Sequence, residues 1–270
     1  MARITTHRGQ APCVNVLILH FMNRKFYYVW VIILSSLISF GCISCGGDDS
    51  SPSSTPQSPD GADRDAAGNL KVSATNFPDE NFRSFLLSQD YGADGVLTEK
   101  EIANIKIIKI PSLNIQSLSG IAFFTSLVEF DCEHNLITSL DMSKNVLLEY
   151  LKCEECKITT LDVSENIKLT KLACHSNQLT SLDVSKNIAL KDLHCPHNKL
   201  ASLDVSNNPN LIRLSCSDNQ LTSLDVSKNT LLEELYCYNN QLTYLDVSNN
   251  TKLTDFRYDT DKVTIYGWPK

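Results

Sequence analysis

The side chains of this chain that could bind metals or form disulfides recur at a fixed spacing. Six cysteines lie 21 residues apart along the chain. Residues at one repeat position of a solenoid stack on their equivalents in the next coil, about 4.8 Å away. Because free cysteine packs as a small apolar residue, the spacing predicts a buried column of free thiols, with disulfides or a metal site as alternatives. The column consists of Cys132, Cys153, Cys174, Cys195, Cys216 and Cys237.

Three histidines of neighbouring repeats could also approach one another. They are His175, His194 and His197. A zinc ion needs three or four ligands in tetrahedral geometry. Since the three residues differ in strand parity, we do not expect them to converge on one ion.

A second column consists of carboxylates. Like charges one strand spacing apart raise each other's pKa unless donors or cations lie between them. We expect Ser and Thr hydroxyls and Lys144, Lys186 and Lys228 to supply this compensation, and a row of bound calcium ions is the alternative. The column is Asp141, Asp162, Asp183, Asp204, Asp225 and Asp246.

Enzyme motifs are missing from the sequence. We find no nucleophile–base pair, phosphate-binding loop, catalytic carboxylate pair or zinc signature, and the histidines lie only in variable repeat positions and near the amino terminus. The sequence therefore predicts a binding or structural protein, not an enzyme.

The elements that position these columns are two similar half-repeats. One half reads Leu-x-x-Leu-x-Cys-x-x-Asn and the other Leu-Thr-x-Leu-Asp-Val-Ser-x-Asn, as in residues 169–187. Both place apolar residues at positions 1, 4 and 6, which predicts a turn followed by a short strand. The pattern resembles leucine-rich repeats, and residues 119–127 are similar to the internalin subclass. The resemblance implies an α/β-type repeat solenoid, a right-handed coil with a parallel β-sheet on the first half.

The repeats occupy residues 105–252, as one coil of 22 residues and six coils of 21. The second half of each coil should also be extended and could form a second sheet, and residues 253–270 should form a closing cap. In the family that the repeats resemble, asparagines at the ninth position point inward and form hydrogen bonds with loop amides. Cys156 replaces one of these asparagines, and we expect a looser local structure there. The first-half asparagines are Asn135, Asn177, Asn198, Asn219 and Asn240.

The amino terminus reads as an export signal. A basic start from Met22 precedes an apolar run over residues 26–40 and small residues, which is typical of a signal peptide over 22–44, and residues 1–21 are then an upstream extension. The segment resembles a lipoprotein signal, which implies acylation of Cys45, or of Cys42 as the alternative. Residues 45–72 are rich in Ser, Pro, Asp and Gly and should form a flexible tether.

A helical cap over residues 73–104 should cover the apolar start of the solenoid. The stretch from 90 to 101 resembles an EF-hand loop, in which oxygens surround calcium and a glycine makes the turn. Position 3 is Gly92, which has no side-chain oxygen, so a cap without the ion is the alternative. The matching ligand positions are Asp90, Asp94, Val96, Thr98 and Glu101, with Gly95 at the turn.

Side-chain variation between the repeats points to one face as the binding surface. Exposed positions of the second half hardly change, whereas those of the first half vary freely, as a recognition surface requires. Unconstrained solvated positions are the alternative. The candidate residues are Glu129, Tyr150, Lys171, Asp192, Arg213, Glu234, His194, Tyr236 and Tyr238.

Charge narrows the class of partner. The net charge is −7, and without the four basic residues that precede Cys45 the remainder carries about −11. This argues against nucleic acid, or an anionic membrane other than through the anchor, as the partner. The whole chain looks like a Gram-negative, lipid-anchored surface protein with internalin-like repeats. That resemblance implies a monomer on the outer membrane that binds a protein or, as alternatives, a glycan or no specific ligand.

Overall fold

The computed structural model describes residues 61–268. The predicted extension 1–21, the signal peptide 22–44, the acylated Cys45 or Cys42 and the tether as far as residue 60 lie outside the described residues. Among the described residues, no helix combines the length and apolar character needed to cross a membrane.

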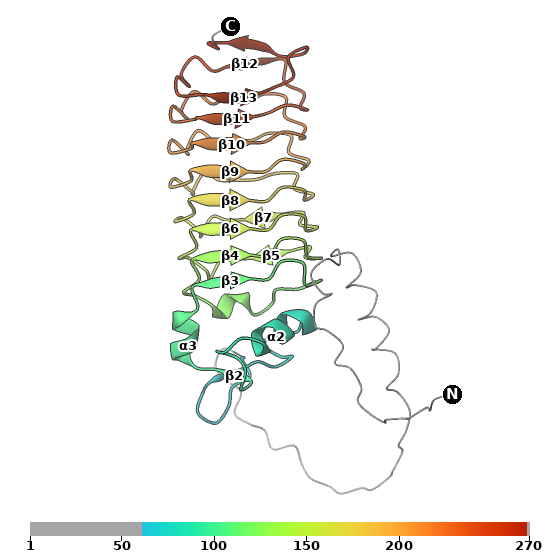
Figure 1. Cartoon of the computed structure of the whole chain (residues 1–270), viewed down its shortest axis with the longest axis vertical. Coiled ribbons are helices and arrows are strands. Elements are labelled where there is room, and N and C mark those ends of the chain that lie inside the picture. The colour runs from blue at the N-terminus through green and yellow to red at the C-terminus, as the bar shows by residue number, and fades with distance from the viewer. Residues whose placement is uncertain (1–60, 269–270) are drawn as a thin grey trace, which may run out of the picture. The chain divides into compact units, whose positions relative to one another are not determined.

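An eight-stranded parallel sheet runs the length of the described stack (Figure 1). Its strands follow the order of the chain, and equivalent residues of successive coils pair without a shift, as Arg213 pairs with Glu234. The fold prediction of a leucine-rich-repeat coil is confirmed. The strands are β3 (Ile107–Lys109), β4 (Glu129–Asp131), β6 (Tyr150–Lys152), β8 (Lys171–Ala173), β9 (Asp192–His194), β10 (Arg213–Ser215), β11 (Glu234–Tyr236) and β13 (Asp255–Arg257).

The second halves of the coils form strand pairs only near the two ends of the stack. Strand β5 (Leu140–Asp141) pairs with β7 (Leu161–Asp162), and β12 (Tyr244–Asp246) pairs with β14 (Thr264–Tyr266). In the middle coils the second halves are not strands, although their leucines and valines still lie in the core. The second sheet is therefore discontinuous within residues 61–268.

The cysteine column lies in the core beside the leucines. All six column cysteines are free, and none is more than 1% exposed. Burial raises the pKa of each of these thiols, so their reactive thiolate form is disfavoured. The column acts as packing.

Asparagine side chains connect successive coils through the core. The Asn177 Oδ1 accepts from the Ile158 amide at 3.0 Å, and its Nδ2 donates to the Cys153 carbonyl at 2.8 Å in the preceding coil. Asn135, Asn198, Asn219 and Asn240 make equivalent bonds. A second ladder follows the other half of each coil, where the Nδ2 atoms donate to carbonyls of the preceding coil from Asn145, Asn166, Asn187, Asn208, Asn229 and Asn250.

The N-terminal cap begins earlier than the predicted residue 73. Strand β1 (Leu70–Lys71) pairs antiparallel with β2 (Val96–Leu97), and Leu70 is fully buried. Residues 61–72 therefore belong to the cap and not to the predicted tether, because their apolar side chains help to cover the first coil. The remaining cap elements are α2 (Glu80–Leu87), α3 (Glu99–Asn104) and the short 3-10 helix η1 (Ile121–Phe123).

Aromatic residues cover the other end of the stack. Strand β13 continues the main sheet, and β14 continues the second half of the coil. Phe256 contacts Trp268 and Tyr258 with ring centroids 5.2 and 4.6 Å apart. Their packing shields the last layer of the core from water.

Candidate functional site

The outer face of the eight-stranded sheet carries the variable side chains. The middle residue of each strand is buried, except for the half-buried Phe256 of β13, and the residues on either side of it share the outer face. The structure thus brings together those predicted residues that precede or follow the middle residue of a strand. Tyr238 comes after β11 and lies half-buried. An open hollow on this face is lined by Tyr150, Lys152, Glu154, Lys171, Ala173, Asp192, His194, Arg213, Leu214, Ser215, Glu234 and Tyr236.

Charges on this face pair between neighbouring coils. Asp192 lies between Lys171 and Arg213, with carboxylate–nitrogen distances of 3.8 and 3.0 Å. Further along the sheet, Lys109 contacts Glu129 at 2.8 Å. Because the pairs are exposed, each adds little stability, but together they fix a pattern of alternating charge on the face.

The tyrosines at the carboxyl end of this face already have partners. The Tyr236 hydroxyl donates to Asp255 Oδ2 at 2.6 Å, and the Arg257 guanidinium lies over the ring, 4.9 Å from its centroid. The hydrogen bond to Asp255, with smaller effects of burial and nearby charges, raises the pKa of Tyr236 to about 12. Arg257 thus covers the face of the Tyr236 ring on which a sugar could stack. Asp255 holds the hydroxyl that could form a hydrogen bond with the sugar.

An exposed aromatic pair lies elsewhere. Tyr244 of β12 and Tyr266 of β14 are 50% and 62% exposed, with ring centroids 5.8 Å apart. Both belong to the second-half strands, so they are not part of the variable sheet face. Sequence reasoning missed Tyr266 as a partner of Tyr244 because the last coil departs from the repeat spacing.

Glu154, His175 and His194 meet at the edge of the hollow. The Glu154 Oε1 lies 2.8 Å from His175 Nδ1 and 3.4 Å from His194 Nδ1, and the two imidazole centroids are 5.0 Å apart. Glu154 is buried, whereas the His194 side chain is 40% exposed. Within residues 61–268 this is the one group of three or more potential ligand side chains close enough to share a metal ion.

The surroundings keep the Glu154 carboxylate ionised. Burial alone would raise its pKa, but the contacts with His194, His175 and Lys152 together lower the pKa of Glu154 to about 2. Lys152 lies 3.5 Å from Oε2 and also contacts Glu133, leaving Oε1 to the two imidazoles. The cluster is a buried anion beside two histidines.

The expectation that the histidines do not converge is wrong for two of the three. His175 and His194 meet because Ala173, on the strand between Lys152 and His194, is small and leaves room above the sheet. Ala173 is only 2% exposed, although it lies on the outer face. His197 lies apart, with its Nε2 3.7 Å from Asp218. Sequence reasoning also missed Glu154, which it treated as one more variable position.

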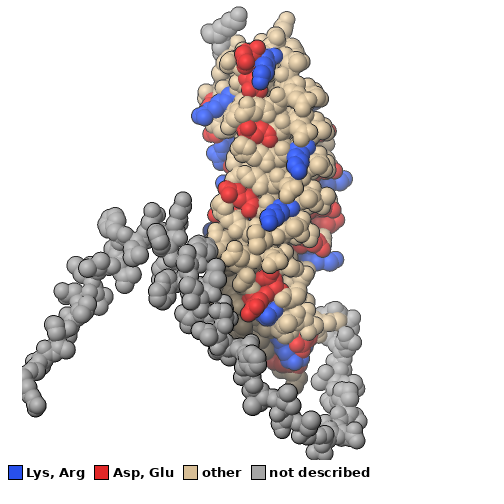
Figure 2. All heavy atoms as spheres, turned by 90° about the vertical axis from the view of Figure 1, so that its right-hand side faces the viewer, with Lys and Arg blue, Asp and Glu red and all other residues tan. Residues whose placement is uncertain are grey.

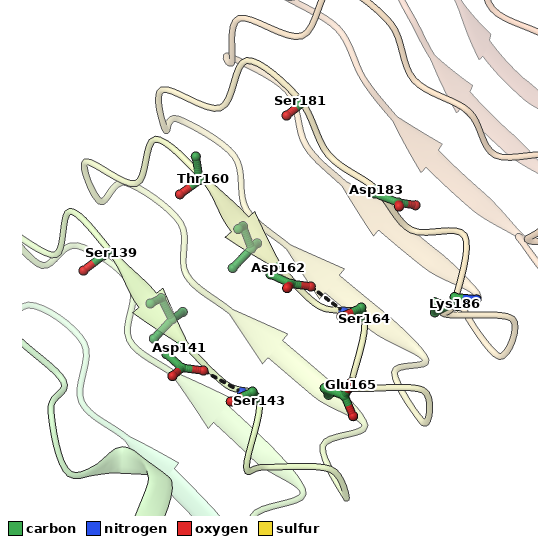
Figure 3. Close-up of a pocket in the computed structure, with 12 residues that line it drawn as sticks. Ser139, Asp141, Ser143, Thr160, Asp162, Ser164, Glu165, Ser181, Asp183 and Lys186 are labelled. Carbon is green, nitrogen blue, oxygen red and sulfur yellow. Dashed lines mark hydrogen bonds between the residues drawn. The ribbon is translucent and has the colours of Figure 1, made fainter.

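The aspartate column lies on the second-half face. Figure 3 shows Asp141, Asp162 and Asp183 in successive coils, with the row of Ser139, Thr160 and Ser181 beside them. Each aspartate accepts a hydrogen bond from the backbone amide of the serine two residues later, at 2.8 to 2.9 Å. These amides and the serine hydroxyls lower the pKa of all six carboxyls. The predicted donors are therefore present, and Lys144, Lys186 and Lys228 further lower the pKa of Asp141, Asp183 and Asp225. The alternative of a row of calcium ions stays a prediction.

The EF-hand-like loop uses two of its predicted ligands to cap a helix. The Glu101 Oε2 accepts from the Thr98 amide at 2.8 Å, and Thr98 Oγ1 accepts from the Glu101 amide at 3.2 Å. Asp94 accepts from the Val96 amide at 3.1 Å. A Cβ atom on Gly92 would lie 2.3 Å from the Leu86 carbonyl oxygen, which explains why position 3 has no side chain. Calcium binding by Asp90, Asp94, Val96, Thr98 and Glu101 stays a prediction.

Positive and negative side chains are interspersed on the side of the solenoid that Figure 2 shows, with wide uncharged areas between them. No broad area of a single sign is present on that visible part of the described surface. Such a surface lacks the basic stripe by which proteins track nucleic acid.

Comparisons with solved structures identify the architecture. No protein-family model matches the chain, and comparison with curated proteins gives no match. The chain is similar to an internalin (inlF) from Listeria monocytogenes, with 22% identity and a TM-score of 0.56 over 74% of this chain and 67% of that one. It is also similar to internalin C2 (inlC2) from the same organism, with 18% identity and a TM-score of 0.50 over 76% of this chain and 100% of that one. These two likenesses show the fold alone.

A third structure has higher identity but a poorer superposition. It is the functional domain of InlJ from Listeria monocytogenes, described as including a cysteine ladder. The identity is 27% over 74% of this chain, and the TM-score is 0.34. This chain spans 62% of the length of that structure.

Proposed function

We propose that this protein binds another protein through the outer face of its eight-stranded sheet and performs no catalysis. The observation that carries the proposal is the hollow on that face, which is lined by side chains that differ from coil to coil. Leucine-rich-repeat solenoids commonly bind proteins with extended surfaces of this kind. The alternating charges of Lys171, Asp192 and Arg213 favour a partner with a complementary charge pattern.

We further propose that the protein is exported and held at the outer membrane surface by a lipid on Cys45, or on Cys42. The support is the signal-like sequence of residues 22–44 and the polar stretch that follows it. The fold is compatible with this role, because a solenoid capped at both ends keeps its core shielded while the sheet face stays accessible. Labelling with radioactive palmitate, compared between wild type, Cys45→Ala and Cys42→Ala, tests the anchor and identifies the cysteine.

The binding proposal is tested by inverting charges without breaking their pairs. The variant Lys171→Glu, Asp192→Lys, Arg213→Glu keeps each attraction between neighbouring coils and reverses the pattern that the partner meets. Residues 61–270, which include the whole described core and both caps, are screened against purified matrix proteins, bacterial surface proteins and a glycan array. We expect a protein ligand whose affinity falls at least tenfold in the inverted variant.

The matched control is Lys228→Glu. Like the inverted variant, Lys228→Glu changes the net charge of the protein by −2. Lys228, however, lies on the second-half side, near Asp225. A protein ligand kept by the control and lost by the inverted variant supports the proposal. A glycan ligand that survives the inversion supports the glycan alternative, and the absence of any ligand supports a purely structural role.

A further inference from the structure

The cluster of Glu154, His175 and His194 suggests a ligand of its own. Its members come from three consecutive coils, and the protein's repeat pattern gives no reason for two imidazoles and a carboxylate to meet there. We propose that these three side chains bind a divalent transition-metal ion of the zinc class. The inference goes beyond the proposed function and holds whatever the sheet face binds.

The ligand spacing fits such an ion. Zinc binds imidazole nitrogen at about 2.0 to 2.1 Å and carboxylate oxygen at about 2.0 to 2.2 Å, so the ligand atoms of a tetrahedral site lie about 3.3 Å apart. Here the Glu154 Oε1 is 2.8 and 3.4 Å from the two imidazole nitrogens, and all three ligand atoms lie within 4.8 Å of one another. Small side-chain rotations bring them into register, and the fourth position is left for water.

One of the two imidazoles has a buried nitrogen without a hydrogen-bond partner. The His175 Nδ1 is inaccessible to solvent and close to Glu154, but the direction of the contact is not that of a hydrogen bond. The other ring nitrogen, Nε2, lies 3.8 Å from Glu155 Oε1. Imidazoles that bind metals characteristically have a carboxylate on the nitrogen opposite the ion, where it fixes the tautomer.

The surroundings favour a cation and limit its movement. Asp131, Glu133 and Glu154 carry three negative charges around the single Lys152, so the site has net negative charge when the histidines are neutral. Glu154 is only 8% exposed, and Ala173 below the imidazoles is 2% exposed. A side chain larger than alanine at position 173 would fill the space through which His194 reaches Glu154.

The alternative is a cluster whose direct side-chain contacts are sufficient without an ion. Calorimetric titration of metal-free residues 61–270 with zinc chloride near pH 7.5 separates the two cases. We expect one zinc ion per chain, and cobalt(II) in its place should give the visible absorption of a tetrahedral site.

The decisive variant is His194→Ala, because this side chain is 40% exposed and its removal leaves the core intact. We expect its zinc affinity to fall at least tenfold and the cobalt absorption to disappear, while circular dichroism stays unchanged. The matched control His197→Ala removes a neighbouring exposed histidine outside the cluster and should bind zinc like wild type. Because the ligands span three coils, zinc should also raise the Tm of wild type and not that of His194→Ala.

Two results would overturn the inference. The first is the absence of one-to-one zinc binding by the metal-free protein, which would mean that the three side chains form direct contacts only. The second is binding that survives His194→Ala or is lost in His197→Ala, which would place the ion elsewhere. Neither result bears on protein binding by the sheet face, since the inverted-charge variant leaves Glu154, His175 and His194 in place.

Discussion

Exchanging Cys156 and asparagine between two coils should change stability in opposite directions. Cys156 occupies the ladder position of its coil, where its Sγ lies 3.4 Å from the Cys132 and Glu154 carbonyls. Its pKa is lowered by the hydrogen bond with Cys132 and by backbone amides, including that of Ile137. In the next coil the equivalent Asn177 accepts from the Ile158 amide and donates to three carbonyls at 2.8 to 3.2 Å.

The hydrogen bonds that differ between the two side chains determine how much the free energy of unfolding should change. In Asn177→Cys the buried Ile158 amide loses its oxygen acceptor, which costs about 1 to 3 kcal/mol, and one donated bond worth about 1 kcal/mol is lost. We therefore expect the free energy of unfolding to fall by about 3 kcal/mol, which is a drop in Tm of roughly 6 to 12 °C for a domain of this size. In Cys156→Asn the same groups are gained, partly offset by repacking, so unfolding should cost about 1 to 2 kcal/mol more.

The assay is thermal and urea unfolding of residues 61–270 for wild type and both variants, followed by circular dichroism. The double exchange is the control, because it keeps the composition of the chain while moving the defect by one coil. If Cys156→Asn leaves the Tm unchanged or lowers it, the thiol is better accommodated than an amide at this position, and the argument from backbone satisfaction is wrong.

Two further predictions concern the aspartate column and the cap. The column carboxyls have lowered pKa values in the folded protein, chiefly because serine amides and hydroxyls donate to them. They therefore contribute stability above the unfolded pKa of about 3.8, and this stability is lost as the pH falls through the folded pKa. Asp162→Asn combined with Asp183→Asn keeps the acceptors and removes two titrations, so its Tm should fall less than that of wild type between pH 5 and pH 3; equal falls would refute the assignment. In the cap, Gly92→Asp restores the missing EF-hand carboxylate, but its Cβ would lie 2.3 Å from the Leu86 carbonyl. We expect it to lower stability by about 1 to 3 kcal/mol without strengthening calcium binding relative to wild type, as measured by unfolding and calcium titration of both proteins. A calcium-dependent rise in Tm larger than that of wild type would contradict this.

The repeat pattern predicted the solenoid because identical residues at one spacing have one packing solution. The buried leucines, the cysteine column and Asn177 with its equivalents each occupy the same environment in every coil, so a single sequence phrase predicts many contacts. The start of the cap could not be placed this way. Leu70 has no equivalent in the repeats, and its burial depends on pairing with Leu97 across residues 72–95, a segment that includes α2 and that no repeat specifies.

Sequence variation grouped the variable residues on one face but predicted none of the contacts between them. Sequence variation places Lys171, Asp192 and Arg213 on one face, because they share a repeat position, yet it says nothing about which of them pair. The tyrosines show the same limit. The sequence places Tyr236 on the variable face, but its contacts with Asp255 and Arg257 depend on side-chain reach between coils, which the repeat pattern does not specify.

Contacts between different columns follow a spacing that can be searched for in any chain of this type. Partners one coil apart and two positions along the strand are 19 residues apart in sequence, as are Lys152 with Glu133 and Tyr236 with Asp255. Two coils with the same offset give 40 residues, which is the separation of His194 and Glu154. A comparison made one column at a time overlooks such pairs, although the offset of two positions keeps both side chains on the outer face and the small Ala173 leaves room between them. The cluster was therefore encoded in the sequence as a 40-residue spacing around Ala173, and the same search applied to other solenoids should find sites that column-by-column reading overlooks.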